Sequence, residues 1–363
     1  MTPMYRRPLA LLIGNAVVMA VVAVAVDLSN GDVQFLDPDS SFLGPTWLRL
    51  PLLLAAAVLV DLVPRALWTS RLRVVQVPGL AKERWKTHWT KERITLVAAG
   101  ILCFYVVYVS YRNLKSWLPK LFPDEKFDHE LHLLDRAMFF GHEPGNVFHS
   151  VLGTGWVAWP LSLIYLWFLP LVPIAVVAWI VWSPSLRFGY WFVAADCLTW
   201  SLGTLSYYAL PTLGPGIEYA HVYSDLPHTP TTDLMASIVN ARQDYLWMGQ
   251  HDILNSVAGF ASLHCAITLL TALMVQYTLQ NRWLHRLAWA NFAITVVATI
   301  YFGWHYVADD IAGIMIALVA FYIAGVASGY RFGPKPDRKK PVHLTAAPVG
   351  AVDDSVGLSP PAQ

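Results

Sequence analysis

Two histidines in apolar surroundings are the residues of this sequence best suited to chemistry. His305 precedes Asp309 by four residues, and His264 lies 41 residues before His305. On a helix, an i, i+4 spacing places two side chains on one face within reach of each other. A carboxylate there accepts the Nδ1 proton of the imidazole and leaves Nε2 as a nucleophile or base. His264, arriving from a different helix at a similar depth, would serve as the general acid.

The same residues allow two other interpretations. His264, His305 and Asp309, with His251 as a fourth ligand, have the donor types that bind zinc. In the other interpretation the polar residues are structural, and the protein transports or binds lipids with a catalytically inert fold. A pair of broken helices in matching halves would favour transport, and the sequence shows no such pair.

The composition is that of a membrane protein. Of the 363 residues, 56% are hydrophobic and 13% are charged, whereas an ordinary soluble domain has roughly 45–50% and about 25%. The 25 basic and 24 acidic residues give a net charge of +1, so no basic excess points to a nucleic-acid partner. The 3 cysteines all lie in apolar runs, which argues against a disulfide framework or a thiolate zinc site.

Eight apolar stretches are long enough to cross about 30 Å of hydrocarbon. The stretch 47–63 is the weakest because Arg49 and Asp61 interrupt it, and we expect Arg49 to extend to the interface. The stretch 152–182 exceeds one crossing, so it tilts or begins with a segment in the interface. The stretches cover residues 8–26, 47–63, 94–111, 152–182, 188–211, 260–281, 287–304 and 306–330.

These stretches predict an all-α integral membrane protein with about eight transmembrane helices. We expect two extra helices and a basic loop in residues 1–93, a six-helix catalytic core in 94–332, and a disordered tail in 333–363. Lys and Arg concentrate in the loops of one side, with 18 of the 25 basic residues. That side is predicted to be cytoplasmic and to hold both termini. The two histidines then lie on the outer side, in a protein of the plasma membrane.

The sequence around both histidines resembles the type 2 phosphatidic acid phosphatase superfamily. Residues 260–264 (Phe-Ala-Ser-Leu-His) are similar to its Pro-Ser-Gly/Leu-His signature, and residues 301–313 to its His-x3-Asp signature. Residues 208–215 (Tyr-Ala-Leu-Pro-Thr-Leu-Gly-Pro) lie where its first signature belongs. The sequence of this segment resembles the branch of fungal-type inositol phosphorylceramide synthases. Residues 111–113 (Tyr-Arg-Asn) and 135–144 resemble the same branch. The resemblance spans about residues 94–330.

The resemblance implies a role for each matching residue. His305 would attack phosphorus and become a phosphohistidine, Asp309 would orient it, and His264 would protonate the leaving group. Ser262 would contact a phosphate oxygen. Both imidazole rings should then face one cavity with centres within about 10 Å, given a hydrogen-bond reach of about 3 Å on each side. This chemistry needs no cofactor and no metal.

The sequence departs from the superfamily where phosphate-binding cations are expected. Its first signature would place cations at Tyr207 and Gly214, and its third would place Ser-Arg at residues 298–299 (Ala-Thr); the related branch often has Arg where this chain has Gly216. A pentacoordinate phosphate still needs charge stabilisation. If no other cation reaches the site, the protein would be an inactive member. The candidates are the cations Arg112, Lys115 and Arg242, and the neutral donors Tyr207 and Tyr208. Of the cations, we predict that Arg112 and Arg242 bind the phosphate.

Taken together, the residues and the resemblance predict a membrane enzyme acting on a lipid at the outer leaflet. It would transfer a phosphoryl or phospho-alcohol group from a lipid phosphate or phospholipid donor to inositol or another alcohol. The alternative is hydrolysis, which would make it a lipid phosphate phosphatase. The long outer loop 212–255 favours transfer because it would shield the site from water.

Overall fold

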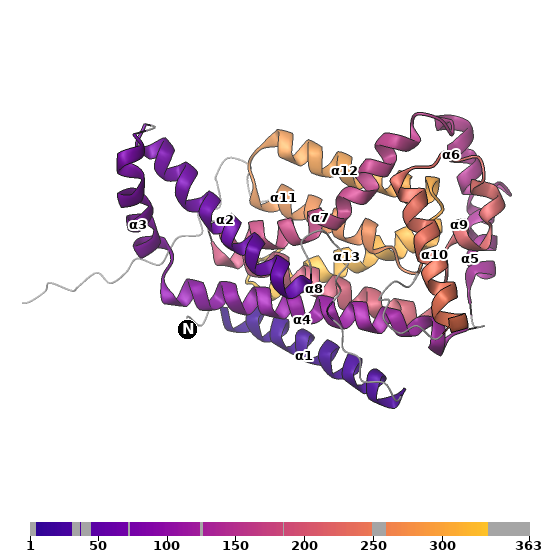
Figure 1. Cartoon of the computed structure of the whole chain (residues 1–363), viewed down its shortest axis with the longest axis horizontal. Helices are drawn as coiled ribbons and strands as arrows, with labels where there is room; N and C mark the ends of the chain where they lie inside the picture. The colour runs from indigo at the N-terminus through magenta and orange to yellow at the C-terminus, as the bar shows by residue number, and fades with distance from the viewer. Residues whose placement is uncertain are drawn as a thin grey trace, which may run out of the picture. The chain divides into compact units, whose positions relative to one another are not determined.

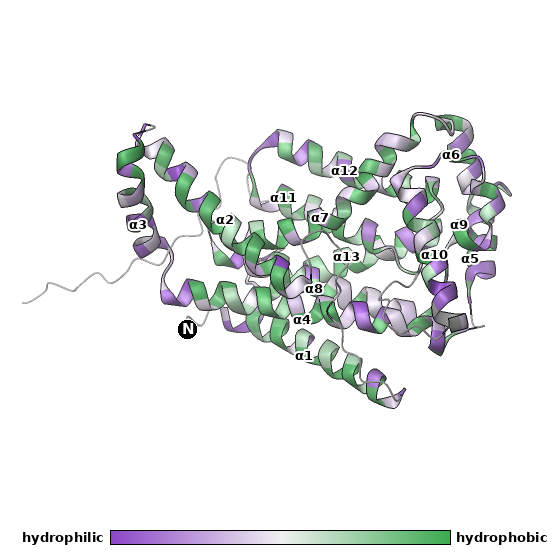
Figure 2. Cartoon of the chain, in the orientation of Figure 1, coloured by the Kyte–Doolittle hydropathy of each residue, from purple (hydrophilic) through white to green (hydrophobic). Residues whose placement is uncertain are grey.

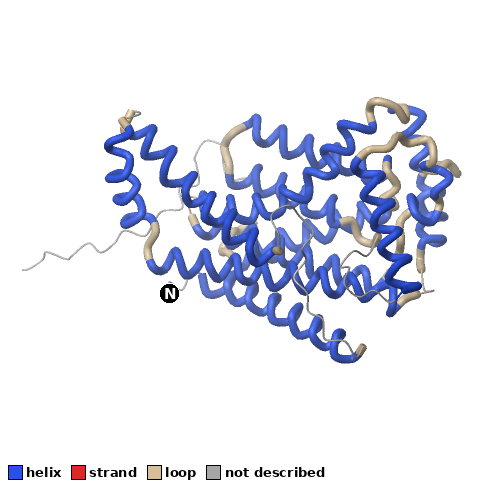
Figure 3. The backbone as a smooth tube through the Cα atoms, viewed as in Figure 1, coloured by secondary structure: helices blue, strands red, loops and turns tan. Residues whose placement is uncertain are grey.

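The structure is a computed structural model in which every regular element among the described residues is helical (Figure 3). It describes residues 5–30, 37, 45–71, 73–123, 126–183, 185–248 and 259–332. The described residues up to Tyr330 belong to one compact unit. The predicted disordered tail and His251 lie outside the described residues.

Long helices form on each of the apolar stretches that the sequence marks out (Figure 1). Their bounds are α1 (Arg6–Ser29), α2 (Thr46–Thr69), α4 (Lys91–Leu121), α7 (Ala158–Trp182), α8 (Leu186–Ala209), α11 (Leu263–Thr278), α12 (Arg282–Tyr301) and α13 (Val307–Ala327). Within the described ranges, five are both long and apolar enough to cross a membrane: α1, α2, α4, α7 and α13. The chain is therefore an all-α integral membrane protein, while the count of eight crossings stays a prediction.

The remaining helices connect these eight. They are η2 (Val74–Gln76), α3 (Val77–His88), α5 (Asp128–Met138), α6 (Pro144–Leu152), α9 (Pro215–Glu218), η3 (Ala220–Tyr223) and α10 (Pro230–Met248). The overlong stretch 152–182 begins at the last residue of α6, passes through a turn and continues as α7. Gly153 ends α6 with a φ of 76°, a conformation that glycine adopts without strain. The membrane helix α7 begins only at Ala158.

The core of the bundle surrounds α8. This helix contacts α1, α4, α7, α11 and α13, and its residues 189–197 are all buried. Green, hydrophobic residues cover much of the long helices in Figure 2. Helices that face lipid on one side gain little from burying apolar surface, so close packing of small residues becomes important. At Gly313 of α13, a Cβ atom would lie 2.2 Å from the carbonyl oxygen of Ser262.

The second membrane helix tolerates its carboxylate because that carboxylate is paired. Asp61 of α2 accepts hydrogen bonds from Arg84 of α3 at 2.7 and 3.0 Å, and the Arg65 Nε lies 3.2 Å from it. The Asp61 side chain is fully buried. A buried charge is stable only when such partners replace its hydration. These bonds fix the end of α2 against α3.

We expect Gly313→Ala to destabilise the protein because its methyl group would collide with the backbone of α11. Overpacking of this kind costs about 1–3 kcal/mol of unfolding free energy. The thermal unfolding midpoint in detergent should therefore fall by several degrees. Gly14→Ala in α1 is the matched control, since a Cβ there meets nothing within 4 Å. Equal midpoints for the two variants would contradict the close crossing of α11 and α13.

Candidate active site

The predicted histidine–aspartate pair forms at the start of α13. The His305 Nδ1 lies 3.4 Å from the Oδ2 of Asp309 and 2.9 Å from the carbonyl oxygen of Gly259. Because a carbonyl can only accept, Nδ1 carries the proton in this arrangement. The neutral ring then has an unprotonated Nε2, which is the form required of a nucleophile or base.

Asp309 is held by the first turn of its own helix. Its Oδ2 accepts the backbone N–H of Tyr306 at 2.9 Å, and its side chain is fully buried. A negative charge at this position is favoured by the positive end of the helix dipole. The carbonyl oxygen of Asp309 also accepts the N–H of Ser262 at 3.0 Å. The first turn of α13 is thereby bonded to the start of α11.

His264 lies in the first turn of α11, between two aromatic rings. Its ring stacks on Tyr165 with centroids 4.2 Å apart, and the Phe168 centroid is 4.0 Å away on α7. The ring centroids of His264 and His305 are 6.2 Å apart. This distance is within the expected limit of about 10 Å and leaves room for one phosphoryl group between the rings. The catalytic roles of the two histidines stay predictions.

Ser262 begins α11 as its N-cap residue. Its Oγ accepts the backbone N–H of Cys265 at 3.4 Å, and the residue is fully buried. An N-cap serine stabilises the helix that carries His264 by satisfying one of the unpaired N–H groups of the first turn. Ser262 does not belong to the described lining of the cavity that contains both histidines.

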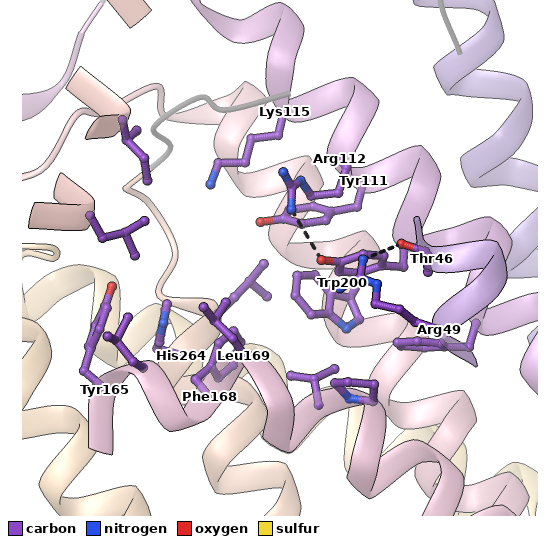
Figure 4. Close-up of a pocket in the computed structure, with 18 of the residues that line it drawn as sticks. Thr46, Arg49, Tyr111, Arg112, Lys115, Tyr165, Phe168, Leu169, Trp200 and His264 are labelled. Atoms are coloured by element: carbon purple, nitrogen blue, oxygen red, sulfur yellow. Dashed lines mark hydrogen bonds between the residues drawn. The ribbon is translucent and has the colours of Figure 1, made fainter. Parts of the chain in front are cut away.

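Both imidazoles line one cavity of about 280 Å³. Its wall comes from α2, α4, α7, α8, α10 and α11, together with residues 304–305, and Figure 4 shows many of the lining side chains. Three cations, Arg49, Arg112 and Lys115, face it, and the described lining includes no carboxylate. A cavity with this charge is suited to an anionic ligand.

The structure brings some of the predicted substrate-binding residues into this cavity and leaves others out. Arg112 and Tyr207 line it, whereas Arg242 and Tyr208 are absent from its described lining. The Tyr208 hydroxyl instead donates to the carbonyl oxygen of Leu114 at 2.7 Å. Arg242 lies on α10, where burial lowers the pKa of its guanidinium.

Two of the positions at which a phosphate-binding cation was expected, Gly214 and Gly216, leave no room for a side chain. The N–H of Gly216 donates to the carbonyl oxygen of Gly303 at 2.6 Å, and a Cβ on Gly216 would lie 2.8 Å from that oxygen. A Cβ on Gly214 would lie 2.6 Å from the carbonyl oxygen of Trp304. The loop after α8 therefore packs backbone against backbone beside His305. A long basic side chain at either glycine would separate the two segments.

Arg49 lines the cavity, a position that the sequence analysis did not predict. It donates from Nη2 to the Thr46 Oγ1 at 2.9 Å (Figure 4). Its extension to the membrane interface stays a prediction. The available clue was that a basic residue inside a membrane stretch is costly and marks a functional site by default. This clue did not decide the position of Arg49, because the residue lies near the end of an apolar stretch, where long side chains also reach the interface.

Asp310 received no role from the sequence, yet it joins the three helices of the site. Its Oδ2 accepts the Thr299 hydroxyl of α12 at 2.8 Å, and its Oδ1 accepts the Cys265 thiol of α11 at 2.9 Å. Asp310 is itself in the first turn of α13. Removing this carboxylate would leave buried donors on two neighbouring helices without partners, which is costly.

The short helix α5 supports the site from outside the bundle core. Asp128 accepts the N–H groups of Leu213 and Gly214 at 2.9–3.1 Å and the Tyr306 hydroxyl at 3.0 Å. Asp135 accepts the N–H of Val307 at 2.9 Å, at the start of α13. Neither carboxylate was predicted to contact the site. Only the fold reveals that α5 lies against α13 and the loop after α8.

Comparison with family models places residues 129–323 in the PAP2 superfamily. This match covers more than half of the chain. The chain belongs to the PAP2 superfamily. It is therefore a membrane enzyme of the phosphatase or phosphotransferase type, acting on lipid phosphates. Comparison with curated proteins and with solved structures gives no match.

The PAP2 match runs from α5 into α13 and includes His264, His305 and Asp309. It leaves α1 to α4 outside, and these helices carry all three cations of the cavity. In the part of the chain that the structure describes, no three His, Cys, Asp or Glu side chains gather closely enough to hold a metal ion. His251, the fourth ligand of the zinc interpretation, lies outside that part.

The burial of Asp135 predicts a pH dependence of stability. Desolvation, with the nearby Asp309 and Asp310, raises the pKa of its carboxyl from 3.8 to about 7. Between these pH values the folded state keeps a proton that the unfolded state has lost, so this group lowers stability as pH rises towards 7. Asp135→Asn, which does not titrate, should reduce the fall of the unfolding midpoint between pH 5 and 8.

The control for this prediction is Glu130→Gln, which removes an exposed carboxylate from the same helix. Its midpoint should change with pH as the wild type does. If Asp135→Asn also shows the wild-type pH profile, Asp135 is not the buried, proton-binding group described above.

Proposed function

We propose that this protein transfers a phosphoryl or phospho-alcohol group of a lipid through a phosphohistidine on His305. The observation that carries the proposal is the pair of imidazoles on one cavity, 6.2 Å apart. His305 has its Nδ1 engaged by Asp309 and Gly259, and Nε2 is the remaining nitrogen. PAP2 membership supports the same class of chemistry.

In the first step, Nε2 of His305 attacks the phosphorus atom of the lipid. The bond between phosphorus and the lipid oxygen breaks, and that oxygen takes the proton of His264. In the second step, His264 accepts the proton of an alcohol or water as the oxygen attacks the phosphohistidine. The P–N bond breaks, and both histidines return to their starting states. Asp309 keeps the His305 ring in one tautomer throughout.

In this proposal, side chains of α4 stabilise the negative charge on the phosphoryl oxygens in the transition state. Arg112 and Lys115 are i, i+3 neighbours on that helix and both line the cavity. The Arg112 Nη1 is 3.4 Å from the Tyr108 hydroxyl, and the Lys115 ammonium lies 6.0 Å from the Tyr111 ring centroid. Cations positioned in advance of the reaction stabilise the transition state without reorganisation. Arg112 and Lys115 take this role in place of Arg242.

Inositolphosphotransferase-like transfer is the finer form of the proposal, and hydrolysis is the alternative. Transfer is supported by α10, whose Leu234 and Ile238 side chains help to close the cavity. A hydrogen bond of 2.8 Å between Thr231 and Ser162 holds α10 on α7. Excluding water favours attack by a bound alcohol. The proposed location is the outer leaflet of the plasma membrane, with both termini cytoplasmic, as the distribution of Lys and Arg favours.

Turnover by variants of the two histidines should depend differently on the pKa of the leaving group. His305→Ala should abolish turnover and the covalent phosphoenzyme with every substrate. His264→Ala should slow turnover of a lipid phosphate about 10²–10⁴-fold. Because p-nitrophenolate leaves without protonation, p-nitrophenyl phosphate should recover much of that loss. Asp309→Asn should lower kcat more than it raises KM.

His142→Ala is the matched control for these variants, because this histidine is exposed and does not line the cavity. Its kinetics should equal those of the wild type. Rescue of His305→Ala by p-nitrophenyl phosphate, with no rescue of His264→Ala, would reverse the assigned roles. Unchanged turnover in both variants would remove the proposed function.

Transfer and hydrolysis can be separated by following the acceptor. The purified protein is incubated in detergent with phosphatidic acid or phosphatidylinositol as the donor and labelled inositol as the acceptor, and the lipids are analysed by thin-layer chromatography. Transfer predicts labelled lipid that depends on His305. Release of phosphate without any labelled lipid would instead establish the phosphatase alternative.

A further inference from the structure

Different kinds of contact orient the two imidazoles of the cavity. The His305 ring is fixed through its Nδ1 by Asp309 and the carbonyl oxygen of Gly259. Among the described residues, aromatic rings contact the His264 ring, and no group donates to its nitrogens or accepts from them. The Ser262 cap fixes the backbone of the first turn of α11, but the χ2 torsion of a histidine is broad. The plane of the His264 ring must therefore be set by packing.

A stack of four aromatic rings provides this packing. The Tyr165 ring lies nearly parallel to that of His264, with centroids 4.2 Å apart and planes inclined by 11°. The Phe168 ring follows at 4.0 Å and 31°, and Figure 4 shows these three side chains next to one another. Beyond Tyr165, the Trp304 ring stacks on it at 5.5 Å and 21°. Because Trp304 precedes His305, the stack connects the chain segment of one histidine to the ring of the other.

The two rings from α7 are held firmly in place. Tyr165 is 2% exposed and Phe168 is 6% exposed, and their i, i+3 spacing places both on one face of α7. Close to them on the same helix, the Ser162 hydroxyl is hydrogen-bonded to that of Thr231 on α10 at 2.8 Å. Buried side chains in a close-packed interior keep a single rotamer on average. The stack thus offers His264 one fixed plane.

The same contacts suit the charge that His264 carries as a general acid. In the proposed first step its ring is protonated, so it is a cation until the leaving oxygen takes the proton. An aromatic face attracts a cation that lies within about 6 Å of the ring centroid. The centroids of Tyr165 and Phe168 both lie within that range of the His264 centroid. Stacking therefore stabilises the protonated ring as well as orienting it.

We propose that Tyr165 and Phe168 are positioning residues for His264. Their rings hold the imidazole in the plane from which its N–H points at the leaving oxygen, and they act through His264 rather than on the phosphate. The ring of Tyr165 is what matters in this role, and its hydroxyl is dispensable. The inference rests on the proposed function, because it takes His264 to be the general acid.

Tyr165→Leu removes the stacked ring, and its kinetics should resemble a weaker form of His264→Ala. We expect kcat for phosphatidic acid to fall about 10–100-fold, since a misplacement of about 1 Å costs about 10²-fold. Turnover of p-nitrophenyl phosphate, whose leaving group needs no proton, should change by less than about threefold. Tyr165→Phe keeps the ring and should match the wild type with both substrates.

Trp167→Leu is the matched control, because it makes the same replacement on the same helix. Trp167 is 46% exposed and does not belong to the described lining of the cavity. Its kinetics should equal those of the wild type. Phe168→Leu repeats the test from the second stacked ring, so the result does not depend on the folding of one variant. The thermal unfolding midpoint of each purified variant is measured alongside its kinetics.

A double-mutant cycle distinguishes positioning from a general contribution to the fold. If Tyr165 acts through His264, Tyr165→Leu should slow phosphatidic acid turnover by less than about twofold when His264 is already alanine, because residues that act as a unit are not additive. A purely structural role would give the same loss in both backgrounds. Equal slowing of both substrates by Tyr165→Leu and Phe168→Leu, or additive losses in the cycle, would overturn the inference.

The same measurements separate this inference from the proposed function. If His264→Ala turns over phosphatidic acid as fast as the wild type, the proposed function fails on that result alone. If His264→Ala shows the expected dependence on the leaving group while Tyr165→Leu and Phe168→Leu do not, the function stands and the positioning role is wrong.

Discussion

The candidate site depends on the hydrogen bonds around the first turn of α13. Asp309 faces the His305 Nδ1 through its carboxylate and holds the start of α11 through its carbonyl oxygen, which accepts the Ser262 N–H. A single buried residue thus orients one imidazole and positions the helix that carries the other. Because a buried carboxylate is costly without partners, the packing around this turn has to satisfy it, and that requirement fixes the geometry of the site.

The surrounding elements add further hydrogen bonds around the same turn. Asp310 receives hydrogen bonds from α11 and α12, while Asp135 of α5 accepts the N–H of Val307 in the same turn of α13. Asp128 binds both Tyr306 and the glycine-containing loop after α8. These carboxyl groups gather at one helix N-terminus, where they accept hydrogen bonds from backbone N–H groups that have no partner within the helix. The site is therefore rigid on the side that orients His305.

The opposite side of the cavity carries the positive charge. The loop after α8 approaches residues 303–304 so closely that Gly214 and Gly216 leave no room for basic side chains, and the cations lie instead on α4 and α2. The predicted catalytic residues thus lie within the family match, and the cations that line the same cavity lie before it. In our proposal this arrangement places the reacting histidines and the cations that stabilise the phosphate on one cavity.

The sequence by itself determined the membrane character and the helical stretches, because these follow from composition and periodicity. It also paired His305 with Asp309 by their spacing, although His305 lies two residues before α13 begins and reaches Asp309 from the preceding turn. It also marked His264, since its motif is local. Only the tertiary structure decided that Arg49 faces the cavity, that Arg242 and Tyr208 are outside its described lining, and that α5 supports α13. Those contacts join residues distant in the chain. The physical reason is that helical periodicity fixes which face a residue occupies, whereas the partner of that face is set by how all the helices pack together.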